Sequence, residues 1–168
     1  MLQQVNSIVE STQLWWSVRP HHRFGTVEVR ICDAQTRGEE SSALLALIAA
    51  CAAQTAIEYD RNGYDGAGTP LRDREIEENL WRAIRYGMDG KLIDFRRRAE
   101  VEAKQALEEL IKWTAPARER LGVEVALAEE NGAQRARRGL HDGRSIEEIY
   151  REAVAETGRT YVAEELVG

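Results

Sequence analysis

One strand pattern sets the strongest limit on what this chain can fold into. From Thr26 to Cys32 polar and apolar residues alternate strictly, as expected for a strand that buries one face. The apolar side consists of Val27, Val29 and Ile31. A run rich in Trp and Val, residues 14–18, precedes this strand after a short connection. The two segments therefore predict an antiparallel pair whose apolar face packs on helices.

After Asp33 the apolar spacing becomes helical. We expect helices over residues 36–59, 72–86, 99–113, 116–131 and 145–158, and another over residues 1–12. A strand pair followed by a helical region indicates an α+β fold. Because two strands make a poor sheet, we expect further strands to come from elsewhere.

Residues at the helix ends support these boundaries. Thr36 with Glu39, and Ser145 with Glu148, have the spacing of a capping box. Gly87 is well placed to cap the helix that ends at Tyr86.

The polar side of the strand carries the candidate chemistry. Glu28 and Arg30 are two residues apart, so their side chains share a face about 6.6 Å from one another. A carboxylate suits Mg²⁺ and a guanidinium suits phosphate, so the pair can hold a metal ion beside a polyphosphate. From the pattern alone, a cross-strand ion pair on a solvated face is the simpler interpretation.

Two motifs resemble the bacterial carboxylate–amine ligases similar to glutamate–cysteine ligase. Residues 15–20 read WWSVRP and residues 25–33 read GTVEVRICD, where the family shows WW-x-x-RP and GT-x-E-x-R-x-x-D. Residues 79–90 read NLWRAIRYGMDG and residues 92–94 read LID, against the family pattern N-x-W-x-A-x-R-x-G-x-D-x-x-L-I-D. The order and spacing of both motifs match the family.

The resemblance implies a glutamine synthetase-like catalytic fold and assigns roles to five residues. Glu28 matches a metal ligand, and Arg30 matches a catalytic arginine that contacts nucleotide phosphates. Arg19 matches a catalytic arginine that contacts substrate carboxylate or phosphate. Arg82 and Arg85 belong to the second motif and are candidate cofactor contacts, with a structural role equally open. The implied cofactors are ATP and Mg²⁺, and the implied reaction joins the γ-carboxylate of glutamate to cysteine or another amine through an acyl phosphate.

The family also begins with a glutamate-rich strand, G-x-E-x-E, which nothing before Trp15 matches. We therefore interpret residues 1–168 as a single domain that forms the carboxy-terminal half of a larger catalytic domain. Its amino-terminal half would come from the same or another chain. A different hypothesis is a non-catalytic helical interaction or regulatory module derived from the ligase fold.

Composition narrows the possible partners and location. The net charge of −6 argues against general binding to nucleic acid or anionic membranes. The basic clusters at residues 96–98 and 135–138 are interpreted as solvated helix faces or ends. No apolar run approaches the roughly 20 residues that span a bilayer. Two isolated cysteines and the absence of a signal-peptide pattern predict a cytoplasmic protein, with homo-oligomers possible.

Overall fold

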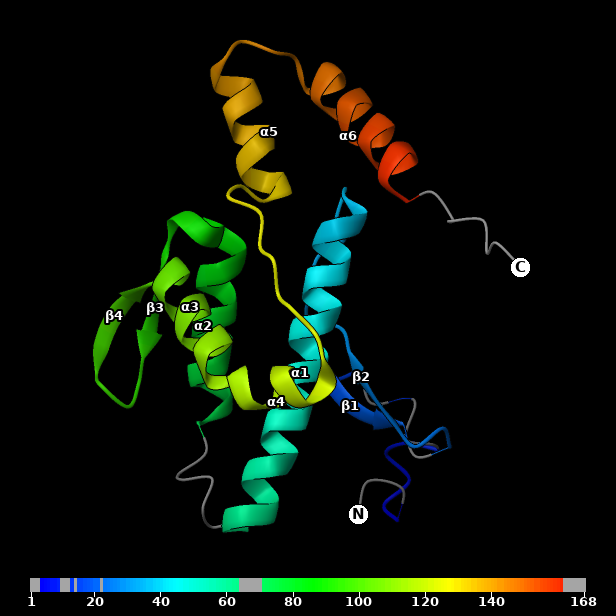
Figure 1. The fold of residues 1–168 in the computed structure, drawn as a ribbon, viewed down its shortest axis with the longest axis vertical. Coiled ribbons are helices and arrows are strands. Elements are labelled where there is room, and N and C mark those ends of the chain that lie inside the picture. Colours follow the sequence, from blue (N-terminus) through cyan, green and yellow to red (C-terminus); the bar gives the residue numbers. More distant parts are fainter. Residues whose placement is uncertain (1–3, 10–12, 14, 22, 64–70, 162–168) are drawn as a thin grey trace. The chain divides into compact units, whose positions relative to one another are not determined.

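The computed structural model describes residues 4–9, 13, 15–21, 23–63 and 71–161. The chain divides into two compact units, Met1–Ala34 and Gln35–Gly168. In the described residues there are six α-helices and two separate antiparallel strand pairs (Figure 1). The predicted α+β class is confirmed.

The first unit is built around the hairpin of β1 (Val18–His21) and β2 (Thr26–Val29). In its register Val18 lies opposite Val29 and Arg19 opposite Glu28. Gly25, with φ +62°, adopts the left-handed conformation that the reversal between the strands requires.

Three predictions for this unit were wrong in extent. The first strand begins at Val18, where the predicted strand ended, and continues to His21. It can include Pro20, because an edge strand tolerates proline. The second strand ends at Val29, three residues earlier than predicted. Of the predicted helix over residues 1–12, the described residues 4–9 form turns and bends. The prediction that the apolar face of the pair packs on helices was also wrong for Val27 and Ile31, which are 60% and 50% exposed.

The long helix α1 (Gly38–Asn62) is the core helix of the second unit. Its buried residues recur every three or four positions and include Ala43, Leu47 and Ala50. This face packs against α4 (Ala115–Leu121), whose Ala117 is fully buried. Small side chains on both helices allow this close packing.

Helix α1 differs from its prediction in two respects. No side chain caps its first residue, so the predicted capping box of Thr36 and Glu39 was wrong. The Thr36 hydroxyl instead accepts a hydrogen bond from Arg135. By length and composition α1 is also apolar enough to cross a membrane, with a mean hydropathy of 1.5 over 18 residues. The expectation that no apolar run approaches the length of a membrane span therefore fails for α1. Only 22% of that stretch is buried, so packing on α4 covers part of its apolar surface.

Helix α2 (Asp73–Tyr86) lies against a second hairpin, formed by β3 (Lys91–Asp94) and β4 (Ala99–Glu102) (Figure 1). The predicted extent of α2 is confirmed to within one residue, and Gly87 caps it with φ +60°. A short 3₁₀ turn, η3 (Gly87–Asp89), leads into the hairpin. The prediction of a helix from residue 99 was wrong, because α3 (Ala103–Trp113) begins only after β4.

Asn79 of the second motif joins α2 to this hairpin. Its side-chain amide donates to the Ile93 carbonyl at 2.9 Å, and its Oδ1 accepts from the Ile93 backbone N–H at 2.8 Å. One side chain thus satisfies both backbone groups of a half-buried strand residue.

Asn79→Ala is expected to lower the free energy of unfolding by about 2 kcal/mol, because two half-buried backbone groups lose their partner. Asn79→Asp keeps the acceptor and loses the donor, so its loss is expected to be smaller. Denaturant unfolding of the three proteins measures both changes. Equal stability of wild type and Asn79→Ala would show that the two hydrogen bonds contribute nothing.

The last two described helices are α5 (Gly132–His141) and α6 (Ile146–Thr160). The predicted helix over residues 116–131 ends instead at Leu121, where Gly122 takes a left-handed conformation. Helix α5 was not predicted. The capping box of Ser145 and Glu148 is confirmed as the start of α6.

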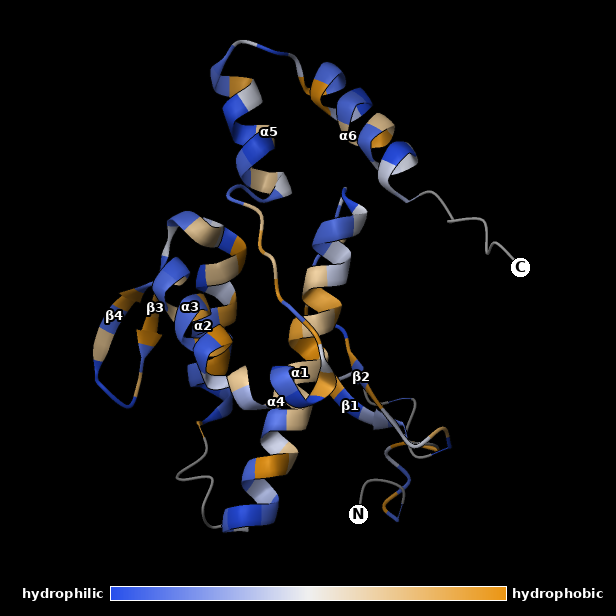
Figure 2. Cartoon of the chain, in the orientation of Figure 1, coloured by the Kyte–Doolittle hydropathy of each residue, from blue (hydrophilic) through white to orange (hydrophobic). Residues whose placement is uncertain are grey.

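Helix α5 is hydrophilic along most of its length (Figure 2), and arginines hold it in place. Arg135 makes a bidentate ion pair with buried Glu40 of α1, at 2.5 and 3.0 Å. Arg137 pairs with Asp89 at 2.6 Å, and Arg138 with Glu130 at 2.7 Å. The basic cluster at residues 135–138 is therefore occupied by contacts within the unit. Residues 96–98 lie in the turn between β3 and β4, which corrects their assignment to a helix.

Candidate functional site

The hairpin of β1 and β2 brings three of the predicted site residues together. Arg19 and Glu28 are cross-strand partners, and Arg19 Nε lies 2.5 Å from Glu28 Oε2. Arg30 Nε lies 3.7 Å from the other carboxylate oxygen, Oε1. Glu28 thus stands between two guanidinium groups, and the shared side of Glu28 and Arg30 is confirmed.

Exposure differs among the three side chains. Arg19 is largely covered, with 12% of its side chain exposed, whereas Glu28 and Arg30 are 37% and 39% exposed. The Arg30 guanidinium lies 5.0 Å from the ring centroid of Trp15, at the distance of a cation–π contact. A ligand can therefore reach Glu28 and Arg30 from solvent more readily than Arg19, whose guanidinium is hydrogen-bonded to Glu28.

The two arginines change the acidity of Glu28. The hydrogen bond from Arg19 is the main cause that holds the pKa of the Glu28 carboxyl below the ordinary glutamate value, and the charges of Arg19 and Arg30 add to it. The carboxylate is therefore ionised at neutral pH, as a ligand for a cation must be.

A pH titration of the Glu28 carboxyl carbon by NMR is expected to show a midpoint below that of a glutamate in an unfolded peptide. Because the folded pKa is lowered, the interaction stabilises the fold above the unfolded pKa and is lost as pH falls through the folded pKa. Arg19→Gln should move the midpoint upward. A midpoint unaffected by that substitution would show that Arg19 does not set the acidity of Glu28.

The cluster has the chemistry to take part in a magnesium phosphate site. Mg²⁺ is commonly held by one or two carboxylates together with substrate phosphates and water, so Glu28 can supply one ligand. Within the described ranges, no group of three or more His, Cys, Asp or Glu side chains is placed to hold a metal ion. Further ligands must therefore come from phosphate, water or another segment. The ion pair that the sequence pattern left open is also present, so a cation at Glu28 would compete with Arg19.

Arg82 and Arg85 belong to the second unit, on α2. Arg82 pairs with Glu78 at 2.9 Å and with Glu100 of β4 at 2.8 Å, so it ties the helix to the hairpin. The hydrogen bonds that Arg82 donates to Glu100 and Glu78 raise the pKa of Arg82. The Arg85 guanidinium lies 5.6 Å from the ring centroid of Tyr86.

Two features of these sites were not identified from the sequence. One is the contact of the Trp15 ring with the Arg30 guanidinium. The paired tryptophans of the first motif were the only sequence feature that pointed to this contact. Arg82 lines a cavity of about 350 Å³ together with Trp81, Tyr86 and Lys91. No sequence spacing links Lys91 to α2, because the hairpin that carries it was not predicted.

Comparison with known proteins points to one family. A model described as "Glutamate-cysteine ligase family 2 (GCS2)" matches residues 1–164. The chain is similar to a protein of Sorangium cellulosum (strain So ce56) named "Putative glutamate--cysteine ligase 2", with 39% identity over 148 residues, 88% of this chain and 37% of that protein. Proteins of the same name in Roseiflexus castenholzii and Solibacter usitatus show similar matches.

The Roseiflexus castenholzii protein is 38% identical over 154 residues, 89% of this chain and 40% of that protein. The Solibacter usitatus protein is 34% identical over 165 residues, 94% of this chain and 42% of that protein. The chain thus spans about two fifths of the length of these relatives.

Proposed function

The chain belongs to glutamate–cysteine ligase family 2, and from that premise we propose that it contributes to an ATP-dependent ligase that joins the γ-carboxylate of glutamate to an amine such as cysteine. The observation that carries this proposal is the position of Glu28 between Arg19 and Arg30, all three at motif positions of one hairpin. Names of relatives support ligase chemistry, and the substrates are part of the proposal.

The proposed reaction has two steps. A γ-carboxylate oxygen of glutamate attacks the γ-phosphorus of ATP, and ADP leaves with the electrons of the broken P–O bond. The amine then attacks the acyl carbon, loses a proton, and phosphate departs with that carboxylate oxygen. Bound Mg²⁺ would neutralise charge on the phosphates.

The residues of this chain would act by binding the metal ion and the charged groups of the substrates. Glu28 would supply a metal ligand, and Arg30 would hold the transferring phosphoryl group through its fork of N–H donors. Arg19 would position Glu28 and contact substrate carboxylate or phosphate. Arg82 and Arg85 are proposed as nucleotide contacts, for which Arg82 would have to exchange a carboxylate partner for phosphate.

The remaining carboxylates of the metal site are proposed to come from outside this chain. Glu28 is a single carboxylate, and the relatives are more than twice as long as the segment they share with this chain. We propose residues 1–168 as the carboxy-terminal half of a catalytic domain, completed in the same or another chain. A cytoplasmic location, where ATP and reduced thiols are abundant, belongs to the same proposal.

A chimera tests the proposal. In the Sorangium cellulosum relative, the 148-residue segment that matches this chain would be replaced by the chain itself. The folded chimera is expected to release ADP and phosphate in equal amounts only when Mg²⁺, ATP, glutamate and an amine are all present, and to form a γ-glutamyl amide.

A circular-dichroism melt of the chimera beside the parent relative establishes that it is folded. A cooperatively folded chimera that binds no Mg·ATP, beside an active parent protein, would contradict the proposal. That outcome would favour the non-catalytic interaction or regulatory module.

A further inference from the structure

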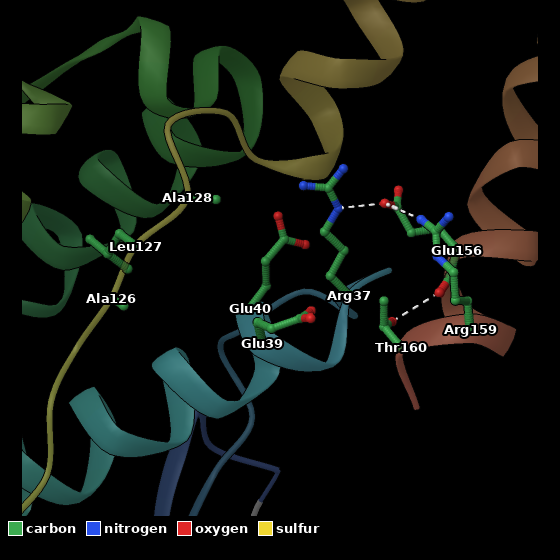
Figure 3. Close-up of a pocket in the computed structure, with 9 residues that line it drawn as sticks. All are labelled: Arg37, Glu39, Glu40, Ala126, Leu127, Ala128, Glu156, Arg159 and Thr160. Carbon is green, nitrogen blue, oxygen red and sulfur yellow. Dashed lines mark hydrogen bonds and ion pairs between the residues drawn. The ribbon is translucent and has the colours of Figure 1, made fainter. Parts of the chain in front are cut away.

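A cavity of about 350 Å³ lies in the second unit, away from the residues of the Glu28 cluster in sequence (Figure 3). Its floor is the first turn of α1, one wall is the segment of residues 126–128, and the other wall is the end of α6. The volume lies at the lower end of the range for small-molecule sites. Three kinds of lining group determine what it can accept.

The first group is the guanidinium of Arg37. Its Nε donates to Glu156 Oε1 at 2.7 Å, and Figure 3 shows this contact beside the cavity. No described residue accepts a hydrogen bond from its two terminal nitrogens. Arg159 shares Glu156 from the other side, at 3.3 Å. Arg37 therefore offers an open fork of donors, which matches a carboxylate in two-point geometry.

The second group is the carboxylate of Glu39. In contrast to Glu40, which is buried and paired with Arg135, Glu39 has no hydrogen bond or ion pair to any described residue. Both side chains rise from the first turn of α1 on the Arg37 side of the cavity (Figure 3). The cavity thus offers open guanidinium donors at Arg37 and an open carboxylate at Glu39, so it can hold a negative and a positive group of the same ligand.

The third group is apolar. Ala126, Leu127 and Ala128 form the wall that faces the charged groups, and Leu127 is 40% exposed. An aliphatic side chain placed against this wall would cover apolar surface that water now reaches.

From these groups together we propose that the cavity binds a free α-amino acid with an apolar side chain. Arg37 binds its carboxylate, Glu39 binds its ammonium group, and the wall of residues 126–128 contacts its side chain. The proposal goes beyond the ligase function, because it uses no residue of the Glu28 cluster and needs neither ATP nor metal.

Isothermal titration of the full chain with three related probes tests the proposal. L-leucine carries both charges, L-leucinamide lacks the carboxylate, and N-acetyl-L-leucine lacks the ammonium group. Leucine is expected to bind, and each derivative at least about tenfold more weakly, because a charged partner is left unmatched. L-glutamate is expected to bind about tenfold more weakly than leucine, since its second carboxylate would face Glu39, Glu40 or Glu156.

Two substitutions locate the binding. Glu39→Gln removes a carboxylate that has no partner in the described part of the chain, so the melting temperature should stay unchanged while leucine affinity falls about tenfold or more. Arg37→Gln should lower affinity in the same way. Glu147→Gln is the matched control, because Glu147 occupies the first turn of α6 as Glu39 does in α1, outside the cavity.

Three outcomes would overturn the proposal. One is the absence of leucine binding up to about 10 mM, which means a binding free energy weaker than about 3 kcal/mol. Another is leucinamide or N-acetylleucine binding as tightly as leucine. The third is an affinity for leucine that neither Glu39→Gln nor Arg37→Gln changes. All three measurements use the chain without ATP, so they stand apart from the outcome of the ligase assay.

Discussion

Glu28→Gln, in a complete ligase that contains this chain, is expected to lower kcat by about 10²- to 10³-fold. The amide keeps the shape of the side chain and removes its negative charge. It would therefore weaken one of few metal ligands and leave Arg19 and Arg30 without their shared partner. Initial rates of ADP release at saturating Mg²⁺ measure the change.

Glu102→Gln is the matched control for this substitution. Glu102 is also an exposed carboxylate on a two-stranded hairpin, and it faces Lys91 at 3.5 Å. Its substitution should leave kcat unchanged. Arg30→Lys should raise the KM for ATP, because lysine cannot reproduce a two-point phosphate contact. Near-normal turnover of Glu28→Gln would remove Glu28 from the proposed metal site.

Glu40→Gln is expected to lower the free energy of unfolding by about 3 kcal/mol, the largest stability change expected in this chain. The side chains of Arg135 and Glu40 are only 14% and 9% exposed, so loss of the carboxylate charge leaves a covered guanidinium uncompensated. Arg135 also bonds Thr36 and the Glu130 carbonyl, so α5 should loosen with it. Denaturant unfolding and amide hydrogen exchange of α5 measure both effects.

Two further variants test whether the loss of stability comes from the burial of the ion pair. Glu147→Gln breaks the exposed pair with Arg151, both 73% exposed, and should cost less than about 0.5 kcal/mol. The double variant Glu40→Met with Arg135→Met removes both charges and should recover much of the stability lost in Glu40→Gln. If Glu40→Gln unfolds at the same denaturant concentration as wild type, the pair does not hold α5 in place.

The sequence predicted those elements whose local signals agree with their tertiary contacts. Alternation in residues 26–32 identified β2 and the shared side of Glu28 and Arg30. Apolar spacing together with Gly87 identified α2 and its end, and the capping box at Ser145 identified the start of α6. In each case a local periodicity or a terminal residue agrees with the element that forms, and for α2 both agree.

Elements held by distant or polar contacts were missed. Residues 99–102, Ala-Glu-Val-Glu, are mostly good helix formers, yet pairing with β3 makes them a strand. Helix α5 has almost no apolar stripe, because ion pairs with Glu40, Asp89 and Glu130 hold it. Its available signal was the capping box of Asn131 and Gln134. Arg82 could not be assigned its partner Glu100 because the intervening hairpin was unknown.

Isotope transfer in the chimera tests the central proposal most directly. Glutamate labelled with ¹⁸O in its γ-carboxylate is supplied with Mg·ATP and the amine, and the released phosphate is analysed by mass spectrometry. A ligase that forms an acyl phosphate moves one labelled oxygen into each phosphate, and Glu28→Gln slows that transfer in proportion to kcat. Unlabelled phosphate, or a folded chimera without turnover beside an active parent protein, would contradict the account.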